Sequence, residues 1–239
     1  MARNTTTAAA TKPDTTIVFP EGRLINGSVF VKDQYDASSS PLYKVEFTQD
    51  MEGPGIDKVI DRVFDLVSQN WNLGDNFKLD IDATAEDLLP KAKGGTGVVI
   101  VDTFFLYGDE LAAKREAKGK PGDAYKGKFV IRADTKYNSD GAEAPGGIAV
   151  YGPDKTPITI LEQGQVYNGM NVIVACNLGF WENEKTGRHA CKCYLKAMQK
   201  TSDGEKLTSP VDHSNLFEAR SVGRDQAAEG GGGRRGRKG

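Results

Sequence analysis

The stretch that decides the fold is residues 167–200, YNGMNVIVACNLGFWENEKTGRHACKCYLKAMQK. Two long runs rich in β-branched and aromatic residues flank the polar segment 182–187, which ends in glycine, and this pattern predicts a β-hairpin. With Trp181 placed opposite Arg188, Cys176 faces Cys193 across the two strands. A slip of one residue in this register would exchange the two faces of the hairpin.

Side chains alternate between the two faces of a strand, so this register sorts the hairpin into two faces. One face is apolar and is expected to lie in the core: Val172, Val174, Cys176, Leu178, Phe180, Cys191, Cys193, Leu195 and Ala197, with His189 near the turn. The other face mixes aromatic rings with cations and contains no carboxylate: Asn177, Gly179, Trp181, Arg188, Lys192, Tyr194, Lys196 and Met198.

This second face has the composition of a surface that binds single-stranded nucleic acid. Aromatic rings stack on bases, and Lys and Arg neutralise phosphates. The alternative is that Trp181 and Tyr194 are covered by a loop or a helix, because tryptophan is mostly buried wherever it occurs.

A second predicted strand within residues 125–137 repeats the pattern. One of its faces carries Lys126, Lys128, Arg132 and Lys136. Lysine on an edge strand also serves to prevent aggregation, so one such strand is weak evidence for binding. Two basic strands in the same half of the chain favour a phosphate-contacting surface.

The net charge of −2 conceals a separation of charge along the chain. Residues 1–119 carry 13 Lys and Arg against 19 Asp and Glu, whereas residues 120–239 carry 18 against 14. The second half is therefore the basic one, and the distribution of charge says more about partners than the total does.

The remaining pattern predicts a mainly β protein with one or two helices, folded as a small barrel or sandwich. Apolar residues at helical spacing over 56–67 predict an amphipathic helix that packs on a sheet, and residues 109–118 predict a second, short helix. Further strands are expected at 16–19, 23–35, 42–49, 76–81, 97–106, 148–151 and 158–161. Residues 1–15 are expected to be a disordered arm, 16–217 the folded domain, and 218–239 a flexible basic tail that includes Arg234, Arg235 and Arg237.

Catalytic and metal-binding motifs are weak. Asp80 and Asp82 would share a strand face and make a metal-dependent nuclease a minor alternative. His189, Cys191 and Cys193 with Cys176 have the ligand types for zinc, but they alternate along strands instead of forming a CxxC knuckle. We therefore predict no enzyme, no metal and no cofactor.

No apolar run is long enough to span a membrane, and three cysteines suit a reducing cytoplasm.

Several blocks resemble a family of phage single-stranded DNA-binding proteins. The first is a strand at 22–30 followed, after a polar insert, by a second strand at 43–48 that leads to the helix. The others are the basic strand 128–137, the long block 165–177, and the close of the return strand at 200–207.

The resemblance implies an OB-fold, an antiparallel β-barrel that binds strands across one face, here with insertions and flexible termini. It implies a sequence-tolerant single-stranded DNA-binding protein of phage replication or recombination in the host cytoplasm. RNA and phage replication or recombination proteins are further candidate partners, and Tyr151 and Tyr167 are further candidates for stacking. Such proteins usually end in an acidic tail, whereas this chain ends in a basic one.

The alternative to a DNA-binding function is a self-assembling virion or scaffold protein whose tail contacts the genome.

Overall fold

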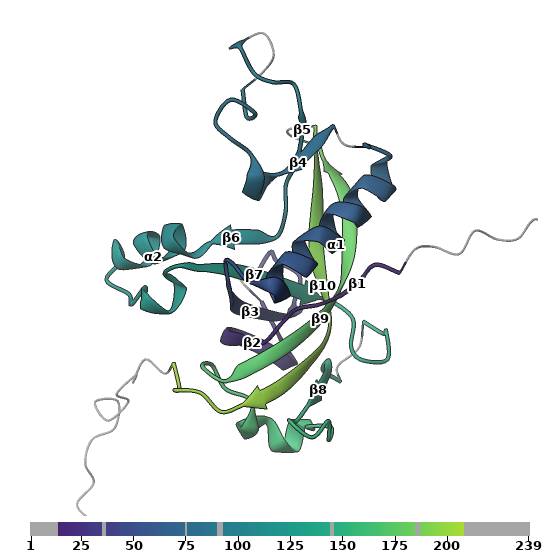
Figure 1. Ribbon diagram of the computed structural model, residues 1–239. Helices are drawn as coiled ribbons and strands as arrows, with labels where there is room; N and C mark the ends of the chain where they lie inside the picture. Colours follow the sequence, from purple (N-terminus) through teal and green to yellow (C-terminus); the bar gives the residue numbers. More distant parts are fainter. Residues whose placement is uncertain are drawn as a thin grey trace, which may run out of the picture. The chain divides into compact units, whose positions relative to one another are not determined.

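The computed structural model describes residues 14–34, 37–74, 76–89, 93–143, 146–184 and 187–207. The predicted tail, its boundary at residue 217 and most of the predicted N-terminal arm lie outside these ranges. The described part is mainly β, as predicted (Figure 1).

The main sheet has eight strands, β1 (Thr16–Val18), β2 (Gly22–Asp33), β3 (Leu42–Asp50), β6 (Phe105–Tyr107), β7 (Lys128–Thr135), β8 (Ala149–Tyr151), β9 (Asn171–Asn183) and β10 (Arg188–Ser202). A small second sheet pairs β4 (Phe77–Leu79) with β5 (Val99–Val101). The helical elements are α1 (Pro54–Trp71), α2 (Gly108–Glu116) and the 3-10 turns η1 (Asp80–Asp82), η3 (Asp123–Tyr125) and η4 (Ile160–Gln165). No helix in the described ranges is long and apolar enough to cross a membrane.

Five of the described strands pair in a closed cycle. β9 pairs with β2, β2 with β3, β3 with β7, β7 with β10, and β10 with β9. All of these pairs are antiparallel except β7 with β10, and β10 also runs parallel to β8. The strands are therefore mostly antiparallel, as expected, but the sheet as a whole is mixed. In the sequence, β8 and β9 lie between β7 and β10. The turn of the hairpin reverses the chain after β9, so that β10 runs parallel to β7.

The helix α1 covers part of this sheet, as its apolar spacing predicts (Figure 1). Proline fits the first turn of a helix, where its missing N–H is not needed, and Pro54 begins α1. Asn72 ends it in the left-handed conformation, with φ of 52°. The buried face joins the main core with residues of β1, β3, β9 and β10: Ile56, Val59, Val63, Leu66 and Val67.

The β9–β10 hairpin forms as predicted, but its register differs by two residues. Cys176 pairs with Leu195, not with Cys193. A shift of two keeps the side chains of β9, and those of β10 as far as Leu195, on their predicted faces, because the side-chain period of a strand is also two. The predicted core residues Val172, Cys176 and Cys193 are accordingly fully buried.

A β-bulge between Leu195 and Ala197 is the feature that the alternation did not predict. A bulge inserts one extra residue and so reverses the facing of the residues that follow. Met198 was expected on the outer face with the cations, and it is instead 1% exposed within the core. Met198 is therefore excluded from the outer face.

Two other local predictions are wrong. The strand expected at 158–161 is replaced by η4, where Thr159 and Glu162 form a capping box at the start of the turn. The continuous strand expected at 97–106 is split into β5 and β6.

Candidate nucleic-acid interface

Tyr194 is the centre of the outward face of the hairpin. Its side chain is 44% exposed, and its ring lies against Gly179 of the neighbouring strand. A Cβ atom built on Gly179 would stand only 2.1 Å from Cε2 of Tyr194. The absence of a side chain at Gly179 therefore allows the tyrosine ring to lie close to the strand with the remainder of its surface in solvent.

Lys192 and Asp134 lie beside this ring. Nζ of Lys192 is 5.5 Å from the centroid of the Tyr194 ring and 2.6 Å from Oδ1 of Asp134. Asp134 comes from β7, whose parallel pairing aligns it with Tyr194. The hairpin itself carries no carboxylate in this region, but the adjacent strand supplies one. The expectation of an outward face without acidic groups holds only within the hairpin.

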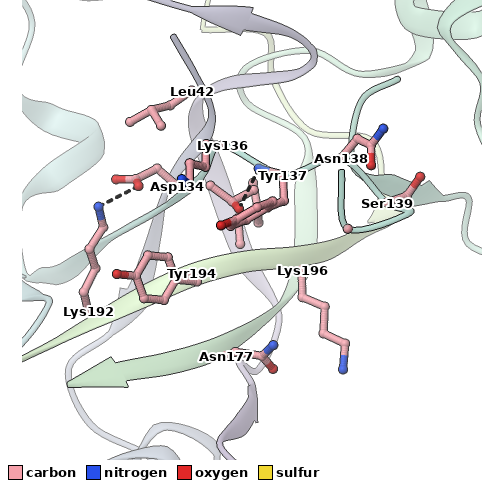
Figure 2. Close-up of a pocket in the computed structure, with 13 residues that line it drawn as sticks. Leu42, Asp134, Lys136, Tyr137, Asn138, Ser139, Asn177, Lys192, Tyr194 and Lys196 are labelled. Carbon is pink, nitrogen blue, oxygen red and sulfur yellow. Dashed lines mark hydrogen bonds and ion pairs between the residues drawn. The ribbon is translucent and has the colours of Figure 1, made fainter. Parts of the chain in front are cut away.

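A groove of about 790 Å³ opens at this point of the surface (Figure 2). It lies where the end of β7, the segment that follows it, and the outward sides of β9 and β10 meet. The two basic strands singled out from the sequence therefore contribute to one concave surface. The lining includes Asp134, Lys136, Tyr137, Asn138, Asn177, Lys192, Tyr194 and Lys196.

Tyr137 is a second exposed ring in the groove, and the sequence analysis did not choose it. Its side chain is 43% exposed, and Nζ of Lys136 lies 5.1 Å from its ring centroid. Lys136 also forms an ion pair with Glu143, and hydrogen bonds to Glu143 and Tyr137 raise the pKa of Lys136. The available signal was the position of Tyr137 at the end of the predicted basic strand, beside Lys136.

Lys196 differs from the other candidate cations of the described chain. It is exposed, lines the groove and makes no ion pair with any described residue. The bulge places it at this rim beside Asn177 and Tyr194, and its charge helps to lower the pKa of Asp14 without forming an ion pair. A phosphate that binds Lys196 therefore has no direct ion pair to break.

The other candidate cations on or next to β7 lie outside the groove, and each contacts acidic groups. Lys126 lies 2.7 Å from Glu116 and also contacts Asp123, and these hydrogen bonds raise its pKa. Lys128 pairs with Asp50. Arg132 Nε lies 2.6 Å from Glu46 of β3.

Trp181 and Arg188 face outward nearer the hairpin turn. Trp181 is 43% exposed on β9 but does not line the groove. Arg188 pairs with Asp102 at 2.5 Å, and burial raises the pKa of Asp102 although Arg188 opposes the rise. These two residues extend the outward face beyond the groove.

Tyr151 and Tyr167 do not join the groove. Tyr151 is half-buried on β8. The Tyr167 hydroxyl donates to Asp203 at 2.8 Å, while Lys200 and Lys206 lie 5.2 and 5.1 Å from its ring centroid. Arg234, Arg235 and Arg237 lie outside the described residues.

The groups considered for metal chemistry are not arranged as a site. Asp80 and Asp82 belong to η1 rather than to a strand face, and Asp80 accepts a hydrogen bond from Thr103 at 2.6 Å. Cys191 and Cys193 are buried, and burial raises the pKa of the Cys191 thiol to about 12. Within the described ranges, no group of three or more His, Cys, Asp and Glu side chains could hold a metal ion.

Exposed aromatic rings beside cations in a surface groove of a β-sheet are typical of proteins that bind single-stranded nucleic acid. Residues 107–228 match the family described as "Enterobacter phage Enc34, ssDNA-binding protein". The match covers more than half of the chain, which therefore belongs to this family.

Solved structures similar to this chain include the single-stranded DNA-binding protein of bacteriophage Enc34 in complex with single-stranded DNA. That structure has a TM-score of 0.52 and 16% identity, with 83% of this chain and 97% of that chain covered. A C-terminal truncation of the Enc34 protein gives a TM-score of 0.52 and 15% identity over 83% and 95% of the two chains. No curated protein matches the sequence significantly. At these identities the likeness concerns the fold.

Proposed function

We propose that this protein binds single-stranded DNA without strong sequence preference and acts in phage DNA replication or recombination in the host cell. The observation that carries the proposal is the groove, which combines two exposed tyrosines with Lys136, Lys192 and Lys196. Membership of the family supports it. The proposed role is binding, with no enzymatic step.

Tyr194 and Tyr137 stack on bases in this proposal, and the lysines contact phosphates. Aromatic rings accept any base because every base has a π-face, so stacking gives affinity without sequence selection. Trp181 and Arg188 continue the path of the strand toward the hairpin turn. The proposed secondary contacts are Lys126, Lys128, Arg132, Tyr151, Tyr167 and the tail residues Arg234, Arg235 and Arg237.

The closed cycle of β2, β3, β7, β10 and β9 supports a more specific assignment of the fold as an OB-fold barrel. An OB-fold is a five-stranded, partly open Greek-key barrel, and it binds oligonucleotides on one face. Five strands with cyclic pairing suit that architecture. The remaining strands and α2 are then insertions around the barrel.

Titration with an oligo-dT strand tests the proposed function. The protein contains two tryptophans, and Trp71 stacks on His189 at 4.5 Å while Trp181 is exposed. A Trp71→Phe variant therefore reports on Trp181 alone. Saturable quenching that weakens as salt rises supports the proposal. Failure of the full chain to bind oligo-dT at low salt would overturn it.

A further inference from the structure

The cations of the proposed interface are largely neutralised by the protein's own carboxylates. Six of the seven described candidates form ion pairs with acidic side chains: Lys126, Lys128, Arg132, Lys136, Arg188 and Lys192. A phosphate that binds such a cation must compete with a carboxylate that already occupies it. The groove pair Lys192–Asp134 is the best placed for this competition.

Three features single out Asp134. Its carboxylate is 25% exposed and holds Lys192 at 2.6 Å inside the groove. Lys192 also lies near the face of the Tyr194 ring. A nucleotide whose base stacks on this ring would bring its phosphate close to Lys192. Asp134 itself carries negative charge into a surface that is proposed to receive a polyanion. A carboxylate in this place opposes binding unless its partner is released.

We propose that Asp134 is a built-in competitor of the DNA phosphate for Lys192, and that this competition limits the affinity of the groove for single strands. The inference rests on the proposed function. In the free protein Lys192 is held by Asp134. When a strand stacks on Tyr194, the ammonium group transfers from the carboxylate to a phosphate, and Asp134 becomes free to attract a cation from solution.

The exchange has a predicted effect on salt dependence. A phosphate neutralised by a lysine releases condensed counterions, which contributes about −0.7 per contact to the slope of log K against log salt for a single strand. In the native protein, uptake of a cation by the released Asp134 offsets part of this contribution. Removal of the Asp134 charge therefore makes binding both tighter and more sensitive to salt.

The experiment compares Asp134→Asn with the native full chain, using fluorescence anisotropy of a labelled oligo-dT over a range of NaCl concentrations. Partly exposed ion pairs are modest, so the expected gain in affinity at low salt is about two- to fivefold. The slope should steepen by up to about 0.7. Glu110→Gln is the matched control, because it removes one negative charge from an exposed ion pair with Lys114 outside the groove; its affinity should change less.

A Lys192→Met background separates competition from a general loss of negative charge. When Lys192 is absent there is no ion pair to exchange, so Asp134→Asn should leave the slope against salt unchanged, whatever affinity it gains from lost repulsion. If Asp134→Asn steepens the slope equally in that background, or if it leaves the affinity unchanged while the native protein binds, the inference is overturned. Asp134→Ser provides a second neutral variant if thermal melting shows that Asp134→Asn is misfolded. A native protein that does not bind oligo-dT would instead overturn the proposed function.

Discussion

Gly179→Ala tests whether the position of the Tyr194 ring matters for binding. The new Cβ would stand 2.1 Å from Cε2 and 2.8 Å from Cδ2 of Tyr194, so the ring must move by about an ångström or more to reach ordinary contact. The φ angle of Gly179 is not positive, so alanine is tolerated by the backbone. Glycine in a strand costs about 0.5–1 kcal/mol relative to alanine, and this offsets part of any strain in the folded state.

The expected result is weaker binding with little change in stability. Stacking of a base on an aromatic ring contributes about 1–3 kcal/mol, and displacement of the ring loses part or all of it. Affinity for oligo-dT should fall by about five- to 100-fold, whereas the thermal midpoint should move by only a few degrees. The slope against salt should stay the same, because no phosphate contact is removed.

Two comparisons make this result interpretable. Gly164→Ala is the matched control, because a Cβ there meets nothing within 4 Å and its backbone is not left-handed. Tyr194→Ala should weaken binding, and adding Gly179→Ala to it should have no further effect, since the two changes act through one ring. Native affinity in Gly179→Ala with an intact fold, or additive losses in the double variant, would refute the reasoning.

Three further predictions concern other parts of the molecule. Tyr137→Ala should reduce affinity for oligo-dT by about tenfold while Tyr137→Phe retains it, because stacking needs the ring and not the hydroxyl; equal losses in both variants would contradict this. The buried cysteines should not react with a thiol reagent at pH 8 in the native protein and should all react in denaturant, since burial raises the pKa of Cys191 to about 12; rapid native labelling would contradict it. Hydrogen bonds from Lys78, Thr84 and Thr96 lower the pKa of Asp87 below its ordinary 3.8, so its contribution to stability is complete above that value and is lost as the pH falls below it. Urea midpoints at pH 3 and 6 should therefore differ less in Asp87→Asn than in the native protein, and an equal difference would count against the role of Asp87.

The alternation of residues 167–200 was sufficient to predict the hairpin and its core face. The register was displaced by two residues because the turn was expected to be longer, yet the period of two preserved the facing of Trp181, Lys192 and Tyr194. The bulge at Lys196 was not predictable from alternation. Its consequence, the burial of Met198, depends on how one extra residue is accommodated between paired strands.

The components of the groove were only partly predictable from the sequence. Lys136, Lys192, Tyr194 and Lys196 were chosen from their strand faces, but their meeting in one groove depends on the parallel pairing of β7 with β10. Tyr137 ends the predicted strand 125–137, where alternation places it on the apolar face with Phe129 and Ile131, but β7 ends at Thr135 and the Tyr137 ring is exposed.

The ion pairs depend on the same tertiary pairing. Asp134 and Glu46 were visible in the sequence, but contact with Lys192 and Arg132 arises only when distant strands become neighbours. Charge counting along single strands therefore overestimated how many cations were available to phosphates.

The central claim is most directly tested by competition between a single-stranded and a duplex oligonucleotide of equal length for the full-length protein, at several NaCl concentrations. Tyrosines that stack on unpaired bases gain nothing from bases already stacked in a duplex, so the account predicts clear preference for the single strand. It also predicts that affinity for the single strand falls linearly on logarithmic scales as salt increases. Equal affinity for both nucleic acids, or binding that is insensitive to salt, would contradict it.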